Sequence, residues 1–246
     1  MEFLKRNFSI ILISSAVIIT GIILGNSYLS KGKPDPVISV TGLGEKTFDS
    51  DLIVWRANFS RNNLDLKQAY ADLNADMKKV KSYLISKGIK VNDIVFEAAD
   101  IQKQYETEYD ENGNVRSTYF SGYLLNQSLK VQSKQVDLIE RTSREVSQLI
   151  DAGIELNSNA PEYYYTQLAQ LKIKMIEQAT KDAYNRAEKI AENGGGSLGN
   201  MLSAEMGVFQ ITAENSSEAY DWGGSFNTTA RRKTANITIR LKYEID

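Results

Sequence analysis

The 246-residue sequence contains no histidine and no cysteine. Without cysteine there are no disulfides, thiol nucleophiles or thiolate metal sites, and without histidine there is no Ser-His-Asp triad or histidine-ligated zinc. Histidine is also the commonest general base near neutral pH, so its absence weighs against an enzyme. The sequence lacks an excess of positive charge too, because its net charge is −2. We therefore predict no catalytic residue, no metal site, no cofactor and no nucleic-acid partner.

The N-terminal segment lacks charge over a long stretch. No charged residue occurs from Asn7 to Ser30, directly after Lys5 and Arg6. As a helix, Phe8 to Leu29 would span roughly 33 Å, which is enough to cross the hydrocarbon core of a bilayer. This pattern predicts a membrane anchor or a signal peptide at residues 1–30. A linker at 31–36 follows, where two of the three prolines disfavour a helix.

Both interpretations of this segment place the remaining chain outside the cytoplasm. An uncleaved anchor fits the length of the apolar run better, and it would hold the protein on the membrane through residues Phe8 to Leu29. The alternative is a signal peptide cut after Gly25-Asn26-Ser27, which would leave a secreted or periplasmic protein. We expect a membrane-anchored, extracytoplasmic protein, on the periplasmic or cell-surface side.

Residues 37–246 combine helical and strand patterns. Apolar residues that recur every three or four positions predict helices at 65–87, 134–151 and 168–193. Glycine follows each of these segments, as is common at helix C-termini. Alternating apolar residues predict strands at 37–43, 52–63, 94–108, 117–131, 154–165, 199–212 and 234–244. Pro161 lies inside one of these segments, which favours an edge strand or a bulge there.

The order of these elements repeats. Strand, helix, glycine, strand, loop and strand describe residues 52–131 and again residues 154–244, with the helix at 134–151 between them. Strands with one apolar face, interleaved with helices, are typical of helices packed on one face of an antiparallel sheet. We therefore predict an α+β fold of duplicated β-α-β-β units with mainly antiparallel sheet, preceded by one N-terminal hydrophobic helix.

Two short motifs are formally similar to ligand-binding loops. Gly194 to Gly199 matches Gly-x-Gly-x-x-Gly, but it follows a helix and precedes a strand, which is the reverse of a dinucleotide site. Asp110, Asn112 and Asn114 resemble the start of a calcium loop, but Val115 stands where that loop requires glycine. We interpret the first motif as a helix C-cap and the second as a hairpin turn, since it contains Asn-Gly.

Three aromatic residues whose burial the sequence leaves open form the candidate interaction surface. Tyr163, Tyr165 and Trp222 are of the types enriched at protein contacts, and they lie on a predicted strand and in a polar loop. They could line a binding surface or a subunit contact. The alternative is that they pack in the core or on the sheet.

Several segments together resemble the SIMPL-domain family, exported bacterial proteins of unknown function that are related to periplasmic immunogenic antigens. The resemblance covers about residues 36–246 and rests on the order and spacing of the following residues: Val40-Thr41-Gly42-Leu43-Gly44 with Asp51; Gly88-Ile89 with Asp93-Ile94; Gly122-Tyr123 before Leu129-Lys130-Val131; Gly153-Ile154; Ala179, Asp182-Ala183, Arg186-Ala187-Glu188 and Ala191; Gly196 with Leu198-Gly199; and Ile237, Ile239, Leu241 and Tyr243-Glu244.

The resemblance implies an export signal or a single anchor, an α+β fold and, for some members, a ring- or channel-like homo-oligomer. It also implies a link to envelope stress and supplies no catalytic residue. We expect a non-catalytic protein of the cell envelope that self-associates as a structural or interaction protein. The alternatives are a cell-envelope hydrolase that uses carboxylates or a Ser/Lys pair, and a ligand-binding module that uses the aromatic residues above.

Overall fold

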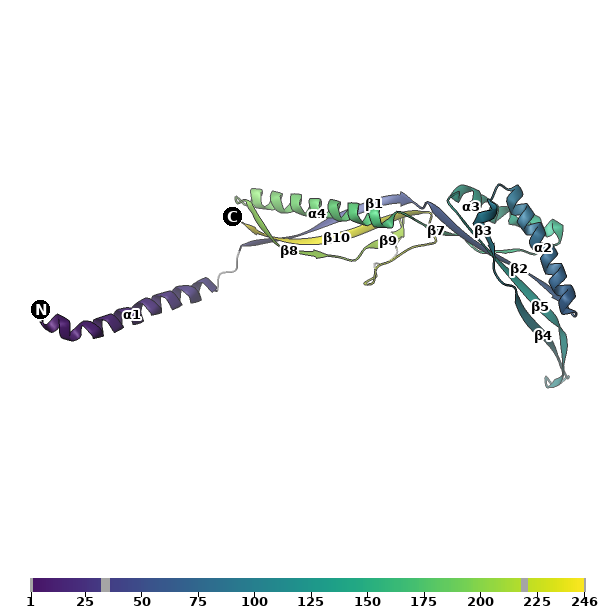
Figure 1. Cartoon of the computed structure of the whole chain (residues 1–246), viewed down its shortest axis with the longest axis horizontal. Helices are drawn as coiled ribbons and strands as arrows, with labels where there is room; N and C mark the ends of the chain where they lie inside the picture. The colour runs from purple at the N-terminus through teal and green to yellow at the C-terminus, as the bar shows by residue number, and fades with distance from the viewer. Residues whose placement is uncertain (1, 32–35, 218–220, 246) are drawn as a thin grey trace. The chain divides into compact units, whose positions relative to one another are not determined.

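The computed structural model of the chain describes residues 2–31, 36–217 and 221–245, and it has the predicted α+β architecture (Figure 1). Helix α1 (Glu2–Lys31) precedes all the strands. The strands form one sheet with the order β1-β10-β8, in which β9 also pairs with β10, and a second sheet with the order β3-β5-β2-β6, in which β4 pairs with β5 and β7 with β2. The bounds of the strands are β1 (Val37–Asp49), β2 (Leu52–Asn63), β3 (Ile94–Phe96), β4 (Asp100–Tyr109), β5 (Val115–Ser133), β6 (Asn157–Ser158), β7 (Glu162–Tyr164), β8 (Leu198–Met206), β9 (Gln210–Ala213) and β10 (Arg232–Ile245).

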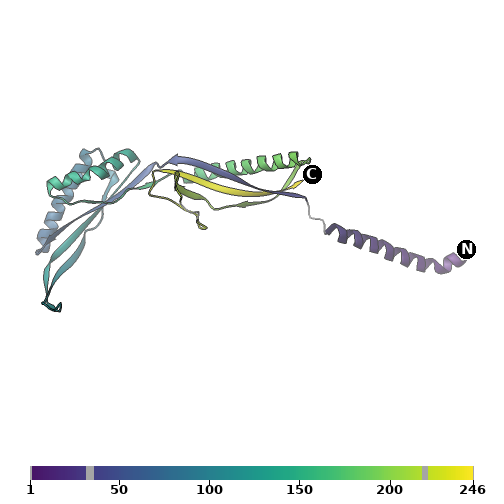
Figure 2. The same ribbon diagram turned by 180° about the vertical axis from the view of Figure 1, so that it is seen from behind.

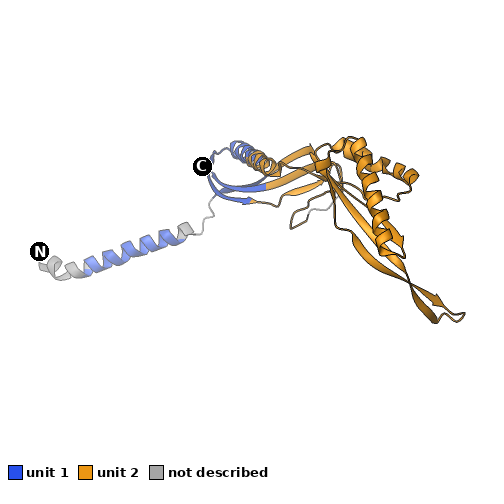
Figure 3. Ribbon diagram, turned by 45° about the vertical axis from the view of Figure 1, so that its right-hand side comes forward, with its two compact units in different colours: residues 1–42, 181–205, 239–246 blue, residues 43–180, 206–238 orange. Residues whose placement is uncertain are grey.

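The chain divides into two compact units, which Figure 3 colours separately. One consists of Met1–Gly42, Lys181–Glu205 and Ile239–Asp246, and the other of Leu43–Thr180 and Met206–Thr238. Both units therefore contain parts of β1, of β10 and of helix α4 (Leu168–Asn193).

The N-terminal anchor was predicted at Phe8 to Leu29, and the side chains of residues 2–9, 11 and 29–31 lie outside the described part of the chain. Over the residues that are described, no helix combines the length and the hydropathy of a membrane span. The described large apolar side chains of α1 are exposed, including those of Ile13, Val17 and Ile22.

The larger unit is built around β2 and β5. The two strands are antiparallel over nearly the whole of β2, from Ile53 opposite Ser133 to Asn63 opposite Tyr123. Two helices, α2 (Leu66–Ser86) and α3 (Val136–Glu145), lie along one face of this strand pair in both views (Figures 1 and 2). The 3₁₀ helix Val146–Ala152 continues α3.

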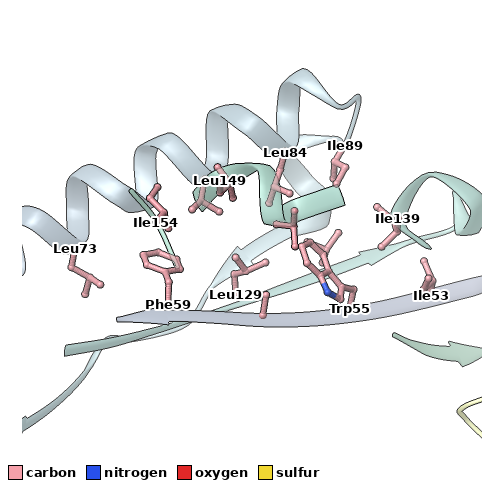
Figure 4. Close-up of a cluster of buried hydrophobic side chains, with 14 of the residues drawn as sticks. Ile53, Trp55, Phe59, Leu73, Leu84, Ile89, Leu129, Ile139, Leu149 and Ile154 are labelled. Carbon is pink, nitrogen blue, oxygen red and sulfur yellow. The ribbon is translucent and has the colours of Figure 1, made fainter. Parts of the chain in front are cut away.

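The core of this unit lies between the helices and the sheet. Figure 4 shows Trp55 and Phe59 of β2 pointing toward α2 and α3. Trp55 is fully buried, and its indole nitrogen donates a hydrogen bond to the hydroxyl of Ser158 at 3.0 Å. The remaining buried apolar residues of this core are Ile53, Ala57, Ala69, Leu73, Val80, Leu84, Ile89, Leu125, Leu129, Val131, Val136, Ile139, Val146, Leu149, Ile154 and Tyr163.

Helix α4 buries a stripe of mostly small apolar residues. Met175, Ala179, Ala183 and Ala187 are all nearly inaccessible to solvent. The backbones approach closely here, because a Cβ on Gly44 of β1 would lie only 2.3 Å from the carbonyl oxygen of Met175. On β10 the buried residues alternate with more exposed ones, as the sequence predicted.

Several predicted elements differ in detail. The predicted strand 94–108 is interrupted at 97–99, and the predicted strand 199–212 is interrupted at 207–209. The predicted strand 154–165 is reduced to β6 and β7, which lie on either side of Pro161 and both pair with β2. The order strand, helix, strands, strand occurs in β2-α2-β3-β4-β5 and in β7-α4-β8-β9-β10. The boundaries of the proposed repeat stay a prediction.

The two motif interpretations agree with the local structure. The backbone N–H of Gly196 donates to the carbonyl of Ala191 at 3.1 Å, and Gly195 has a φ of +83°, so the glycine run closes α4. Asp110 accepts hydrogen bonds from the backbone N–H groups of Asn112 and Asn114 at 2.9 and 2.8 Å. These bonds lower the pKa of Asp110, and they use its carboxylate to hold the hairpin turn.

Candidate functional site

The three predicted interaction residues lie in different environments. Tyr163 on β7 is 8% exposed, so its ring belongs to the core. Tyr165 is half-buried, and its ring centroid lies 4.6 Å from that of Phe48. Trp222 is 98% exposed. Of the three, Trp222 is therefore the residue most available for a contact, and an interaction role for the three together stays a prediction.

Trp222 lies on a turn that the side chain of Gln210 holds in place. Gln210 on β9 is 5% exposed. Its amide nitrogen donates to the carbonyl oxygen of Asp221, and its amide oxygen accepts from the backbone N–H of Ser225, each at 2.7 Å. The backbone N–H of Gly224 closes the turn on the carbonyl of Asp221 at 3.0 Å. The indole is thus fully exposed on a well-bonded backbone, which reduces the entropy lost when it is bound.

A shallow groove of about 550 Å³ lies beside Trp222. Its apolar lining includes Leu43, which is 41% exposed, and Val208, which is 45% exposed. Asn236 and Thr238 of β10 supply polar groups to the same lining. The groove combines exposed apolar surface with a few hydrogen-bonding groups, as protein contact sites do.

A buried lysine lies near this loop. Lys233 of β10 is 1% exposed, and its ammonium donates a hydrogen bond to the carbonyl oxygen of Tyr163. The ammonium also lies 5.5 Å from the ring centroid of Phe226. Burial lowers the pKa of Lys233 to about 8. No carboxylate forms an ion pair with Lys233 among the described residues.

Lys233 satisfies only part of the requirement for a Ser/Lys hydrolase. Such an enzyme needs a lysine of lowered pKa within reach of a serine hydroxyl and of the substrate. The proton of Lys233 is directed to a backbone carbonyl instead, and its side chain is inaccessible to solvent. One local signal points to the burial of this residue: on β10, Lys233 faces the same side of the strand as Ala235 and Ile237, which are buried.

A second apolar surface lies on the hairpin formed by β4 and β5. Tyr105 and Phe120 are directly opposite each other, with ring centroids 5.9 Å apart in an edge-to-face arrangement. Phe120 has the same kind of contact with Tyr123, at 5.0 Å. These rings remain accessible, because Tyr105 is 58% and Phe120 37% exposed.

The aromatic rings of the hairpin continue into a groove beside the first turn of α2. This groove of about 630 Å³ is lined by Leu64, Leu66 and Tyr70 on one side and by Ile101 and Tyr123 on the other. Its lining carries large exposed side chains: Leu64 is 67% and Tyr70 52% exposed. Contiguous exposed apolar surface of this kind is a common feature of interaction sites. We did not predict this surface, because the local sequence pattern indicated only a hairpin turn here.

The carboxylates with clearly shifted pKa values take part in ion pairs or turns. The pKa of Glu162 is lowered, because Arg56 and the hydroxyl of Tyr164 both donate to it at 2.8 Å. The pKa of Glu145 is lowered by Lys87, which donates to it at 2.8 Å. In the described part of the chain no cluster of acidic side chains is suited to hold a metal ion.

The sequence profile of one family, SIMPL, described as a protein of unknown function (DUF541), matches residues 38–241. The chain belongs to the SIMPL family. The match includes most of both sheets, helices α2 to α4 and the two apolar surfaces, while helix α1 precedes it. The resemblance inferred from the sequence is thus confirmed. No curated protein matches the chain.

Proposed function

We propose that this SIMPL protein is a non-catalytic, membrane-anchored protein of the cell envelope that self-associates outside the cytoplasm. The observation that carries the proposal is exposed apolar surface in three places: helix α1, the Trp222 turn and the β4–β5 hairpin. Each of these needs a partner or a lipid environment to remove its apolar atoms from water.

Helix α1 supports the membrane anchor. Its apolar side chains are 56–66% exposed at nine described positions and make no core contact, so packing within the chain does not account for them. The sequence around these positions carries no charge from Asn7 to Ser30. Anchoring would place the folded residues 37–246 outside the cytoplasm, with the N-terminal Lys5 and Arg6 on the cytoplasmic side.

The chemistry of the described side chains favours binding over catalysis. The shifted carboxylates have lowered pKa values, whereas a general acid near neutral pH needs a raised one. Lys233 has a lowered pKa but is buried and is not part of the two grooves. A stress-related role, which the family resemblance implies, belongs to the same proposal and would be exercised through protein contacts.

Self-association is tested by measuring the mass of the full chain in mild detergent, with size-exclusion chromatography coupled to light scattering. One chain has a mass of 27.6 kDa. We expect a protein mass of two or more chains at micromolar concentration, after subtraction of the detergent. A protein mass of a single chain over the whole concentration range would contradict the proposal.

A further inference from the structure

The outer edge of β4 is unpaired in the described part of the chain. β4 pairs with β5 along one side, and no other strand pairs with it. A free strand edge exposes a row of backbone N–H and C=O groups that can pair with another strand. Proteins usually interrupt such an edge with a bulge or a proline, and β4 has no proline over its ten residues.

The irregularities of this hairpin lie in β5, not in β4. Gln104 is opposite Gly122 and the next residue, Tyr105, is opposite Phe120, so Ser121 is the extra residue. Further along, Glu108 is opposite Ser117 and Tyr109 is opposite Val115, so Arg116 is the second extra residue. β2 ends opposite Tyr123, so the part of β5 before Tyr123 also has a free edge. Both extra residues lie in this part of β5. The edge of β4 is regular and better suited to pair.

We propose that the β4 edge binds the β4 edge of a second copy of this chain, as an antiparallel pair with Tyr105 on the two-fold axis. This inference rests on the self-association proposed above and assigns a surface to it. In a symmetric pair with its two-fold axis perpendicular to the sheet, the residue on the axis lies opposite the same residue of the second copy. With Tyr105 on the axis, the side chains that lie opposite each other on both faces of the strand are the most compatible.

The apolar face of β4 is complementary to itself in this register. Ile101 of one copy is opposite Tyr109 of the other, and the two Tyr105 rings are opposite each other. These side chains are 51%, 64% and 58% exposed, so the pairing covers surface that is open to water in the single chain. Aromatic and apolar pairs directly opposite each other are among the cross-strand pairs that stabilise sheets.

Neither Glu106 nor Glu108 lies opposite a like charge in the same register. Glu106 is opposite Gln104 of the second copy, and Glu108 is opposite Gln102. Each carboxylate thus has an amide as its direct neighbour, and the symmetry gives every contact twice. Moving the axis one residue to Glu106 would place the two Glu106 carboxylates opposite each other, which is unfavourable. Moving it to Gln104 would place Asp100 opposite Glu108.

Cysteine crosslinking tests the register, because the chain contains no cysteine of its own. Directly opposite residues in an antiparallel pair have Cα atoms about 4.5–5.5 Å apart, within the range of a disulfide. We expect the full chain with Tyr105→Cys to form a covalent dimer on mild oxidation. Lys103→Cys and Thr107→Cys are the matched controls: each alone should stay uncrosslinked, and a mixture of the two should form a mixed dimer, since 103 is opposite 107.

A charge series at Gln104 tests the contact without a new covalent bond. Gln104→Glu places a carboxylate opposite Glu106 of the second copy, twice per dimer, and we expect dimerisation to weaken roughly tenfold. Gln104→Lys at the same position should leave dimerisation as strong or make it stronger. Combining Gln104→Glu with Glu106→Lys should restore it. The measurement is sedimentation equilibrium of the full chain in detergent.

The outcomes separate this inference from the proposal on which it rests. If the unmodified chain is monomeric, self-association itself is wrong. If the chain is oligomeric but Tyr105→Cys fails to crosslink and both Gln104 variants assemble equally well, self-association stands and the β4 edge is not its surface. Crosslinking of Lys103→Cys alone, as efficient as that of Tyr105→Cys, would overturn the register.

Discussion

At the scale of single residues, Lys233 introduces a cost into the folded state. Its pKa is about 8 in the fold because burial disfavours the ammonium, whereas a solvated lysine titrates near 10.5. Below pH 8 the folded chain must bury the charged form. As the pH rises from 8 through 10.5, the cost disappears, because the unfolded chain then also loses this proton.

The lowered pKa of Lys233 predicts that the stability of the fold rises with pH. The contribution of the residue to the free energy of unfolding should become more favourable by about 2–3 kcal/mol between pH 7 and pH 10. Urea denaturation of the wild type and of Lys233→Met at the two pH values isolates the contribution of Lys233. All other groups titrate in both proteins, so their effects cancel in the difference. We expect Lys233→Met to be the more stable protein at pH 7 and to lose that advantage at pH 10. An equal difference at both pH values would contradict the assignment.

Asp76 on α2 represents the opposite case, a buried charge with good partners. Its carboxylate is 4% exposed and accepts a hydrogen bond from the guanidinium of Arg61, which also donates to the carbonyl of Gly153 at 2.7 Å. Asp76→Asn should lower the free energy of unfolding by about 2 kcal/mol, because Arg61 is left partly buried without its counter-charge. Lys79→Ala is the control: its ammonium is 3.8 Å from Asp76 but 55% exposed, so a change below about 0.5 kcal/mol is expected.

Among the helices and strands, the close contact between α4 and β1 depends on a residue without a side chain. Gly44→Ala would bring a Cβ to 2.3 Å from the carbonyl oxygen of Met175 and to 3.3 Å from the Cβ of Ala179. The helix must move away from the strand, and we expect a loss of about 2–3 kcal/mol in thermal or urea denaturation. Gly223→Ala, with no atom within 4 Å of the new Cβ, should change stability little.

The Trp222 turn is expected to depend on Gln210. Gln210→Ala removes both hydrogen bonds that join β9 to the turn, so the backbone from Asp221 to Ser225 should become mobile while the core stays intact. Backbone and indole ¹⁵N relaxation measures this directly, because Trp222 and the buried Trp55 are the only two indoles. Gln102→Ala on β4 is the matched control. An unchanged order parameter at Trp222 in Gln210→Ala would contradict this role.

The helices were predictable, because their signals are local. The apolar period predicted a helix at 65–87, and α2 spans Leu66–Ser86 with Asp65 as its N-cap. The break between β3 and β4 was not predictable, because it depends on distant groups: the N–H of Glu97 donates to the carbonyl of Ser128, and its carbonyl accepts from the side chain of Gln127. Strand ends are set by such partners, which the local pattern of a strand does not contain.

The candidate surfaces were also predicted only in part from the sequence. Trp222 was predicted as a candidate interaction residue from its type and its polar loop, and that role stays a prediction. The hydrogen bonds that hold its turn come from Gln210, twelve residues away in sequence, which the local pattern does not contain. Tyr163 was predicted as a surface candidate, but its ring packs in the core of the larger unit. The apolar surface of the hairpin was missed because its aromatic residues alternate with Glu106 and Glu108, a pattern that also fits a solvated strand.

For the whole molecule, we predict that α1 holds the protein in the membrane. Full-length protein should stay in the membrane pellet after extraction at alkaline pH, because an apolar helix in the bilayer is not released by removing electrostatic contacts. Ile13→Lys combined with Ile18→Lys places two charges within the apolar run and should release a large fraction of the chain. Arg186→Lys on α4, which keeps the charge, is the control. Release of the unmodified protein would favour the cleaved signal peptide.

The most direct test of the account asks on which side of the membrane the folded residues lie. Glu111→Cys introduces a single thiol at the exposed hairpin turn of a chain that otherwise has none. Intact bacterial spheroplasts that produce this full-length variant are treated with a membrane-impermeant maleimide, and the membranes are then separated from the soluble fraction. We predict that the protein is labelled before lysis and recovered in the membranes. Labelling only after lysis, with the protein in the soluble cytoplasmic fraction, would contradict the account.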